Sequence, residues 1–535
     1  MHVTATAELS QRLDALAATV EELRGQNVKL AEERERYRAL YLQMLELNKK
    51  LERGLLGQKA EKLPADQAQL TLQLLATLLG EQAGTQAPPA ETVQEVGPHT
   101  RRKPTGRKPL PENLPRIEIE LIPDEVQHLG LDAFVKIGEE VSEVIERRPA
   151  SLVAVRIKRP KFVRADRAGS QHTEVITAEP LELPIPRGLA GPGMLADTIV
   201  RRWQDHLPLN RLEAVYAREG LALARSTICG WHEEAALLAR PLVDAMWEDA
   251  FQAPYLCTDA TGVLVQAKER CRGAHFWVVV APERHVLYRY SDKHDSAAVD
   301  RMLAGYQGYL VADAHAVYDH LYADGRVVEV GCWSHCRRYF FKALGSEPER
   351  ARQALAYIRG LFDLERTLGE APRSKREAAR GQQAKPLVDG FFAWCVGQRD
   401  QVLDDTPIAK AVGYALNQRQ ALSRFLDDGR LPLHNNGSEL QLRRQAVGRK
   451  NWLFLGSDQG AEANTTFVSL LASCQMHGIE PWGYLRDLFC LLPGWKRQRV
   501  LELSPLHWKE TLQQEHAQQL LADNPLRQIS LGLLG

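Results

Sequence analysis

The sequence predicts a multidomain α+β protein, and three patterns carry that prediction. Apolar residues repeat in heptads over residues 9–55, strand-like apolar runs alternate with helical patterns over 254–341, and residues 346–430 are helical in pattern throughout. A chain of 535 residues is also too long for one hydrophobic core. We therefore expect a coiled coil, a helix-turn-helix and an α/β domain that is interrupted by a helical insertion.

The composition is that of an ordinary globular protein. Apolar residues make up 44% and charged residues 25% of the chain. No apolar run reaches the roughly 20 residues of a membrane span, and the N-terminus lacks a signal-peptide pattern, so we expect a cytoplasmic protein. The eight cysteines have no framework spacing, which suits reduced thiols. Basic and acidic residues are equal at 68 each, so only a local excess of charge can indicate nucleic acid.

Residues 1–58 are predicted to form a coiled coil. From Leu9 to Leu55 the a and d positions alternate in steps of four and three, and no proline intervenes. Asn27 and Asn48 both fall at a positions, where a polar residue sets register and oligomer state. We favour a homo-oligomer assembled through this segment, and a helical hairpin within one chain is the alternative.

Residues 59–115 are predicted to be a linker with a basic segment that is similar to an AT-hook. Between His99 and Pro109 the linker has five basic residues and no acid, and its prolines forbid a helix. Such a segment can lie in a DNA minor groove, whereas a solvated tether is the alternative. The candidate DNA-binding residues are Arg101, Arg102, Lys103, Arg107 and Lys108.

Residues 116–190 are predicted to be a small β-rich module. Ile117–Ile122 alternates apolar and polar residues, and Leu152–Ile157 is typical of a strand. The run from Arg156 to Arg167 is basic with one acid, Asp166, and we expect it to contact phosphates. The module contains no cysteine, so thiolates cannot build a zinc site in it.

Residues 191–245 are predicted to be a helix-turn-helix DNA-binding region. Arg211–Glu219 and Ser226–Ala236 have helical patterns on either side of Gly220, and Ser226 is expected to cap the second helix. The second helix of such a unit enters a major groove. A helical hairpin without a DNA function has the same pattern. The candidate DNA contacts are Arg211, Arg225, Ser226 and Thr227.

Residues 246–345 are predicted to be the first part of an α/β core. Its expected strands are Pro254–Gln266, His275–Glu283, His285–Ser291, Gly308–Asp313 and Val327–Val330, with helices at Ala297–Tyr306 and Ala316–Ala323. This β-β-β-α-β-α-β order indicates a mixed sheet with helices on its faces. Residues 346–430 form the helical insertion, 431–490 the second part of the core, and 491–535 a helical tail.

The string CWSHCRR follows the last expected strand. Cys332, His335 and Cys336 are conceivable zinc ligands, but they lie within five residues and have no partner pair elsewhere. We favour a structural loop over a zinc site.

Three acids fall where a metal-dependent nuclease would place them. Asp259 interrupts an apolar strand, Asp313 ends another, and Glu439 lies near the start of a helix that Ser438 is expected to cap. Neighbouring strands would set Asp259 beside Asp313, and an unpaired carboxylate there is costly unless it binds a cation. Carboxylates hold Mg²⁺, and paired ions promote in-line displacement at phosphorus. Arg443, Arg449 and Lys450 are close enough in sequence to contact phosphates.

Taken together, several strings resemble transposases of the insertion-sequence 66 family. They are LLGQKAEKL, TRRKPTGRKPLPENLP, VRRWQDHLPLNRLEAVYAREGLALARST, TDATGV, GYLVADAHAVYD, CWSHCRR, NNGSELQLRR and GRKNWLFLGS. The resemblance implies a catalytic domain with an RNase H-like fold and a DDE site that binds Mg²⁺ or Mn²⁺. It makes Asp259, Asp313 and Glu439 the first, second and third acids, separated by the helical insertion after the second. It also implies small accessory proteins of the same element.

The chain departs from this family at one place. The family has a cysteine-ligated zinc module between the basic linker and the helix-turn-helix, and residues 116–190 lack cysteine. We therefore expect no structural zinc: either this module folds without metal or its DNA contact has changed.

The sequence as a whole predicts a DDE transposase. Such an enzyme would cut DNA at the element's ends and join the freed 3′-OH to target DNA. Two alternatives stay open, an RNase H-like nuclease without strand transfer and a non-catalytic DNA-binding repressor.

Overall fold

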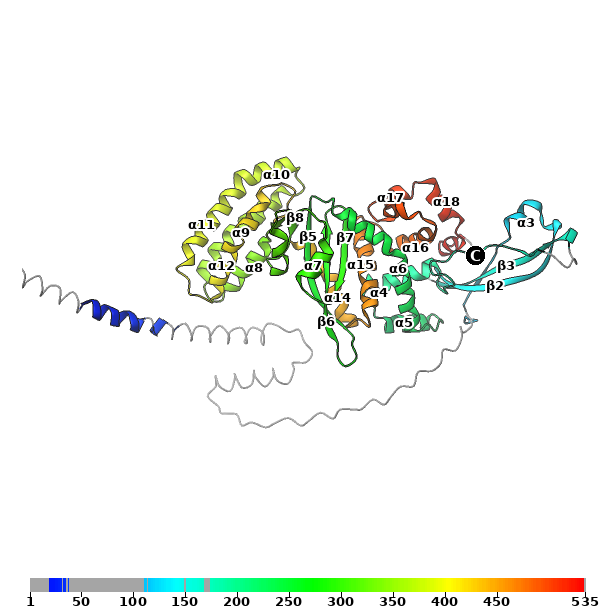
Figure 1. Cartoon of the computed structure of the whole chain (residues 1–535), viewed down its shortest axis with the longest axis horizontal. Helices are drawn as coiled ribbons and strands as arrows, with labels where there is room; N and C mark the ends of the chain where they lie inside the picture. Colours follow the sequence, from blue (N-terminus) through cyan, green and yellow to red (C-terminus); the bar gives the residue numbers. More distant parts are fainter. Residues whose placement is uncertain are drawn as a thin grey trace, which may run out of the picture. The chain divides into compact units, whose positions relative to one another are not determined.

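The computed structural model describes residues 19–30, 32–34, 37, 110–112, 114–148, 151–167 and 174–533. Two compact units are present. One consists of residues 105–338, 357–392 and 417–535, and the other includes residues 339–356 and 393–416 with the N-terminal residues. Figure 1 shows the elements of both units along the chain.

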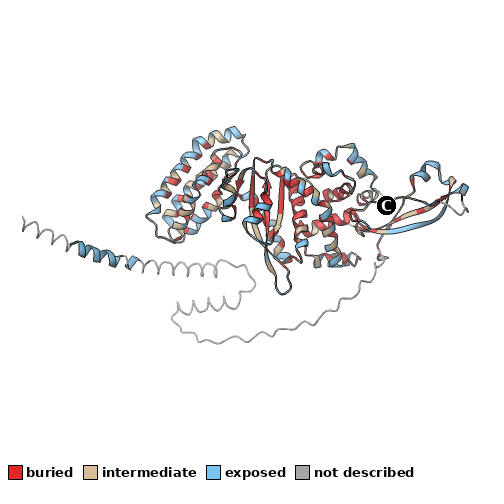
Figure 2. Cartoon of the chain, in the orientation of Figure 1, coloured by how far each residue is buried: buried red, intermediate tan, exposed pale blue. Residues whose placement is uncertain are grey.

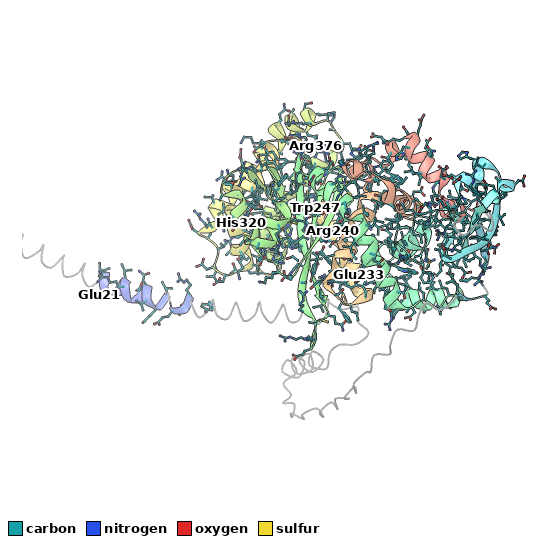
Figure 3. All side chains as sticks on the ribbon, turned by 45° about the vertical axis from the view of Figure 1, so that its right-hand side comes forward. Glu21, Glu233, Arg240, Trp247, His320 and Arg376 are labelled. Atoms are coloured by element: carbon teal, nitrogen blue, oxygen red, sulfur yellow. The ribbon has the colours of Figure 1, made fainter. Side chains whose placement is uncertain are left out.

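The predicted coiled coil lies largely outside the described residues. Within it, residues 19–30 and 32–34 are helical, and Glu21 is labelled on this helix in Figure 3. The seam residues Val20, Leu23 and Leu30 are exposed, so association through the heptads stays a prediction. The basic segment with Arg101, Arg102, Lys103, Arg107 and Lys108 also lies outside the described residues.

A first sheet is built around a long antiparallel hairpin. The central strand β3 pairs in parallel with β1 and antiparallel with β2 and with the short β4. The bounds are β1 (Arg116–Glu120), β2 (Phe134–Arg148), β3 (Ser151–Arg164), β4 (Ile176–Thr177) and helix α3 (Asp124–Leu129). The strand expected at Leu152–Ile157 therefore continues through most of the basic run.

The basic run in β3 is balanced by acids on the strands beside it. Arg156 lies 3.1 Å from Glu143, Lys158 lies 2.6 Å from Glu118, and Lys161 lies 2.9 Å from Glu140. Arg159 also pairs with Glu140. Exposed pairs of this kind add little stability, but they leave the run less available to DNA phosphates than its sequence indicates.

Three helices follow the first sheet, α4 (Pro192–Trp203), α5 (Leu209–Arg218) and α6 (Arg225–Ala250). The helix–turn–helix order of α5 and α6 was predicted, but Ser226 is not the cap. Helix α6 begins one residue earlier, after Ala224, and no side chain caps it. It also runs past Ala236, because apolar residues such as Leu242 and Met246 continue its buried face. In Figure 3, Glu233, Arg240 and Trp247 mark successive points along α6.

A second sheet of five strands forms in the order β7-β6-β5-β8-β9. Strand β6 is antiparallel to β5 and β7, whereas β8 is parallel to β5 and β9. The order of elements predicted over residues 254–330 is the order observed. The bounds are β5 (Tyr255–Val265), β6 (Arg272–Ala281), β7 (His285–Ser291), α7 (Ser296–Leu303), β8 (Gly308–Val311), a 3-10 helix (Ala316–Tyr322) and β9 (Val327–Val330).

Helix α15 (Asp458–Met476) closes one edge of this sheet. The edge strand β7 donates its backbone N–H of Tyr288 to Ser469 Oγ at 2.8 Å and that of Val286 to Ser473 Oγ at 3.0 Å. An open strand edge would invite pairing with another chain. Two serines one helical turn apart therefore accept the backbone N–H groups of β7 that would otherwise be free to pair with another strand. Figure 2 shows the sheet and α15 as mostly buried.

The predicted insertion is helical. Helix α8 (Trp333–Ala343) precedes it, and the elements within it are α9 (Pro348–Leu368), α10 (Arg373–Ala379), a π-helical turn (Arg380–Ala384), α11 (Lys385–Arg399), α12 (Pro407–Asn417), α13 (Arg419–Ser423) and a 3-10 turn (Arg424–Leu426). The Arg380 side chain is fully buried. It pairs with Glu365 at 2.7 Å and donates to the carbonyls of Phe425, Asp428 and Leu431 at 2.7–3.0 Å. This arginine fixes the loop that leads into α14 (Asn436–Trp452).

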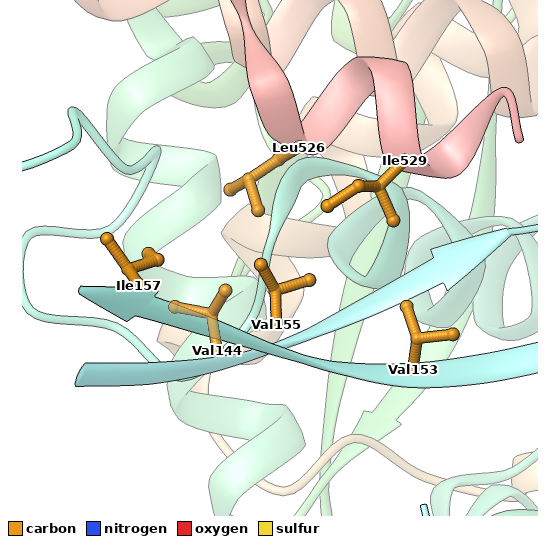
Figure 4. Close-up of a cluster of buried hydrophobic side chains, with 6 residues drawn as sticks. All are labelled: Val144, Val153, Val155, Ile157, Leu526 and Ile529. Atoms are coloured by element: carbon orange, nitrogen blue, oxygen red, sulfur yellow. The ribbon is translucent and has the colours of Figure 1, made fainter. Parts of the chain in front are cut away.

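The C-terminal helices complete the core of the first sheet. They are α16 (Pro481–Leu491), α17 (Trp508–Thr511), α18 (Glu515–Asp523) and α19 (Pro525–Ser530), with 3-10 turns at Leu492–Gly494 and Arg497–Leu503. In Figure 4, Leu526 and Ile529 of α19 lie over Val144, Val153, Val155 and Ile157 of the hairpin. The last helices are thus part of the fold. Nowhere in the described ranges is a helix both long and apolar enough to cross a membrane.

A buried carboxylate joins the hairpin to α4. Glu146 is fully buried and accepts the backbone N–H of Arg147 at 2.7 Å. Burial raises the pKa of Glu146 to about 8, and the N–H groups of Arg147, Met194 and Gly193 oppose that rise. A Cβ on Gly193 would overlap this carboxylate and would lie 2.5 Å from the Arg147 carbonyl oxygen.

We expect Gly193→Ala to destabilise the protein, because the backbone carbonyl of Arg147 cannot move aside as a flexible side chain could. Overpacking of this kind costs about 1–3 kcal/mol. The matched control is Gly230→Ala in α6, where a Cβ meets nothing within 4 Å and alanine should add about 1 kcal/mol of helix stability. Urea unfolding of both variants measures the difference, and equal stabilities would contradict this account.

Candidate active site

Asp259 lies in the middle of the central strand β5 and is half-buried. Its Oδ1 accepts the N–H of Ala260 at 2.7 Å. The pKa of Asp259 is raised to about 6, chiefly by burial and also by Asp313 and Glu439, while the Ala260 N–H and Arg338 act to lower it. The three acids therefore share one electrostatic environment.

Asp313 lies beside Asp259 because β5 and β8 are parallel neighbours. Their register pairs Cys257 with Val311. Two residues further along each chain are Asp259 and Asp313, and a two-residue step returns a side chain to the same face of a sheet. The predicted strand through Asp313 ends at Val311, so the carboxylate stands just beyond the strand end.

Glu439 belongs to the first turn of α14. The start of this helix is attached to β5 by the buried Asn435, whose Nδ2 donates to the Thr258 carbonyl at 2.8 Å. The Asn435 backbone N–H also donates to Cys332 Sγ at 3.2 Å. Ser438 is not the cap we predicted, because the helix begins before it and its hydroxyl donates to the Asn435 carbonyl at 3.0 Å.

The string CWSHCRR contributes two residues to this site. It opens helix α8 instead of forming a loop, and His335 and Arg338 are three residues apart on that helix, hence on one face. Arg338 donates to Glu439 Oε1 at 3.2 Å, and His335 Nε2 lies 3.6 Å from the same oxygen. Sequence reasoning missed Arg338 and considered His335 only as a zinc ligand, although the helical spacing of the two residues was a usable signal.

Three histidine rings meet near Asp313 and were also missed. The His294 ring lies 5.0 Å from that of His275 and 4.7 Å from that of His315, and it stacks on Trp277 at 4.7 Å. Burial lowers the pKa of His294, as do His315 and His275, whereas Asp313 raises it. These rings come from three separate segments, so no local motif indicates their meeting.

The three carboxylates suit a hard divalent cation by their chemistry. All of their donor atoms are oxygens, which Mg²⁺ and Mn²⁺ prefer. Among the described residues, no three His, Cys, Asp or Glu side chains lie close enough together to hold a metal as they stand. Arg338, which contacts Glu439, instead supplies positive charge at this position.

The candidate DNA-binding residues occupy two regions. On α14, Arg443 and Lys450 are exposed, while Arg449 donates to Thr261 Oγ1 at 2.9 Å and to the Gly262 carbonyl. Arg449 therefore joins α14 to β5. On α5 and the start of α6, Arg211, Arg225 and Ser226 are exposed and Thr227 is half-buried, with Arg225 paired to Glu213 at 3.1 Å.

Comparison with known proteins identifies the family. The family model described as "Transposase IS66 family" matches residues 187–463, which include all three acids. A second model, described as "Transposase C of IS166 homeodomain", matches residues 43–119. The first match spans more than half of the chain, so the protein belongs to the IS66 family of transposases.

Two relatives from Sinorhizobium fredii (strain NBRC 101917 / NGR234) extend the similarity over most of the chain. The uncharacterized protein y4hP is 29% identical over 492 residues, covering 86% of this chain and 87% of the relative. The uncharacterized protein y4qI is 29% identical over 441 residues, covering 78% of this chain and 80% of the relative.

We expect Asn435→Ala to lower stability by roughly 1–3 kcal/mol, because it removes a buried donor and leaves the Thr258 carbonyl without that partner. The control is Asn451→Ala on the same helix, since Asn451 is exposed and bonds only within its own turn. Urea unfolding measures both. A loss no larger for Asn435→Ala than for Asn451→Ala would refute the anchoring role.

Proposed function

We propose that this IS66-family transposase uses a DDE mechanism on an RNase H-like domain. The observation that carries the proposal is that Asp313, just past the end of a parallel neighbouring strand, and Glu439, in the first turn of a helix, both act electrostatically on Asp259 in the central strand. The sheet order, with one antiparallel strand beside the central one and two parallel strands on the other side, supports the fold assignment.

The domain division is part of the same proposal. It consists of a coiled coil (1–58), a basic linker (59–115), a cysteine-free β module (116–190), a helix-turn-helix (191–245), a catalytic core in two parts (246–345 and 431–490), a helical insertion (346–430) and the C-terminal helices (491–535).

Asp259, Asp313 and Glu439 would hold the divalent ions. When bound, these ions supply an activated oxygen nucleophile and stabilise the leaving oxygen of the phosphodiester. The chain's own residues prepare the site. Asn435 keeps Glu439 against β5, and Arg338 offsets the acids' mutual repulsion until a cation arrives.

Contacts to DNA would come from the exposed cations near this site and from α5 and α6. Arg443 and Lys450 stand on the helix that carries Glu439, so phosphates held by them would lie beside the carboxylates. Arg211, Arg225, Ser226 and Thr227 would contact the element's end, together with the basic linker.

We expect Asp259→Asn, Asp313→Asn and Glu439→Gln each to lower DNA cleavage and joining by on the order of a thousandfold or more, because each removes a carboxylate that would hold the divalent ions. Double variants should lose little beyond the singles, because residues that act as one unit are not additive. The assay uses Mg²⁺ and a duplex carrying the element's terminal DNA, and it separates cleaved from joined products.

Asp300→Asn is the control, because Asp300 is an exposed acid of α7 that pairs with His320; it should retain activity. Full activity in any two of the three site variants would overturn the DDE assignment. Cleavage without joined products would favour the nuclease without strand transfer.

We also propose that the heptad seam assembles copies of the chain. Leu23→Glu combined with Leu30→Glu should dissociate the oligomer, because both are exposed seam residues that a partner helix would bury. Val28→Glu is the matched control, since Val28 is as exposed, at 59%, but lies outside the seam. Light scattering measures the mass, and an unchanged mass in the double variant would disprove assembly through the seam.

A further inference from the structure

The turn that ends α14 is strained and carries two exposed apolar side chains. Leu453 has φ +63° and ψ −54°, and the Phe454 N–H donates to the Trp452 carbonyl at 2.7 Å. These values define a γ-turn with positive φ at its centre, which is rare and strained. Leu453 is 64% exposed and Phe454 41% exposed, so burial of these side chains does not explain the strain.

The residues on both sides of the turn are firmly held. Trp452 is buried, and a Cβ on Gly448 would lie 2.7 Å from its Nε1. After the turn, the buried Leu455 donates its N–H to the Leu264 carbonyl at 2.9 Å, and its own carbonyl accepts the Gln266 N–H at 2.8 Å. The fold therefore projects Leu453 and Phe454 outward from a rigid base, at the conformational cost of the γ-turn.

Exposed cations lie on the elements on either side of this turn. Lys450 is exposed one turn before it on α14. The tip of the β5–β6 hairpin, which starts at Gln266 beside Leu455, exposes Lys268 and Arg270 and one acid, Glu269. Cations on two sides of an apolar pair favour a polyanion over an apolar protein surface.

The turn also has a defined place relative to the proposed catalytic site. Glu439 is in the first turn of α14 and Leu453 follows its last residue. At 1.5 Å per residue the two are roughly 20 Å apart along the helix, which is the length of about six base pairs. One helix would thus set the spacing between the carboxylates and the apolar pair.

We propose that Leu453 and Phe454 form a wedge that enters the base stack of duplex DNA lying along α14. Leucine and phenylalanine wedges unstack a base step and kink the duplex, while nearby cations hold the backbone. The proposal rests on the function proposed above, and it adds local unstacking of the DNA at a fixed distance from the carboxylates.

The test measures base unstacking directly, with no divalent ion present so that no strand is cut. The full chain is saturated with duplexes that carry 2-aminopurine, a base whose fluorescence rises on unstacking, at a flexible TA step. We expect a several-fold rise with the unaltered protein and its loss with Leu453→Gly combined with Phe454→Ala. Leu237→Ala, which removes an equally exposed leucine from α6, should retain the rise.

Two further variants separate the possible causes of a loss. Leu453→Gly alone should fold at least as stably as the native chain, because glycine adopts positive φ without the steric cost, and yet should reduce the rise. Asp259→Asn should keep the full rise in fluorescence. The wedge can therefore be tested even if the proposed catalytic role of Asp259 is wrong.

Three outcomes would overturn the wedge. They are no rise when the native chain is bound to the duplex, an undiminished rise with the double variant at saturation, and a change in oligomer mass in the double variant without DNA. The last would make this surface a contact between copies of the chain.

Discussion

The hydrogen bond from the Asn435 amide to the Thr258 carbonyl joins segments that are 177 residues apart, and the position of Glu439 depends on it. The rest of α14 is fixed by polar contacts on several sides. Arg449 reaches β5, the Tyr288 hydroxyl donates to the Gln441 carbonyl at 2.8 Å, and Gln445 bonds Asn464 of α15 at 2.6 Å. Each of these polar groups is costly to leave unpaired once it is buried. These contacts fix the position of the helix, and they therefore also fix the position of the carboxylate in its first turn.

The loop that precedes α14 follows directly after the helical insertion. The contacts of Arg380 explain how such a long insertion is compatible with a precisely positioned site. A fully buried guanidinium is tolerated only when its donors are satisfied. Arg380 meets that condition through Glu365 and three backbone carbonyls of residues 425–431. The insertion thus ends in a loop that is held by hydrogen bonds from a planar guanidinium group. The single ammonium group of a lysine could not reproduce that arrangement of donors.

Local pattern was sufficient for much of this fold, and long-range pairing accounts for what it missed. The strands over residues 254–330 are short apolar runs bounded by turn residues, and Asp259 and Asp313 stood out as carboxylates within them. The parallel register of β5 and β8 follows from the helix between β7 and β8, so the meeting of these acids was predictable. The acids that balance the basic run of β3 were not, because Glu118, Glu140 and Glu143 lie on strands whose partners no local pattern names. The same holds for Ser469 and Ser473, which cover the edge of β7, and for Leu526 and Ile529, which fill the hairpin's core.

The prediction that Ser438 caps α14 was wrong for a different reason. It satisfies the composition of a cap, but the helix already begins at Asn436, where Asn435 is engaged with β5.

Charge balance links these structural features to the family's chemistry. Asp259 is raised in pKa by burial and by two neighbouring acids, which means that gathering the carboxylates costs free energy in the absence of a cation. Arg338 reduces this cost from α8, and the partial positive charge at the N-terminus of α14 favours Glu439 in the same way. Both are weaker and more diffuse than a divalent ion at the centre of the three acids. The fold therefore tolerates the acids without metal but retains a residual repulsion among them. Under the mechanism we propose, a cation bound among the three acids would remove that repulsion, so metal binding would also stabilise the assembled site.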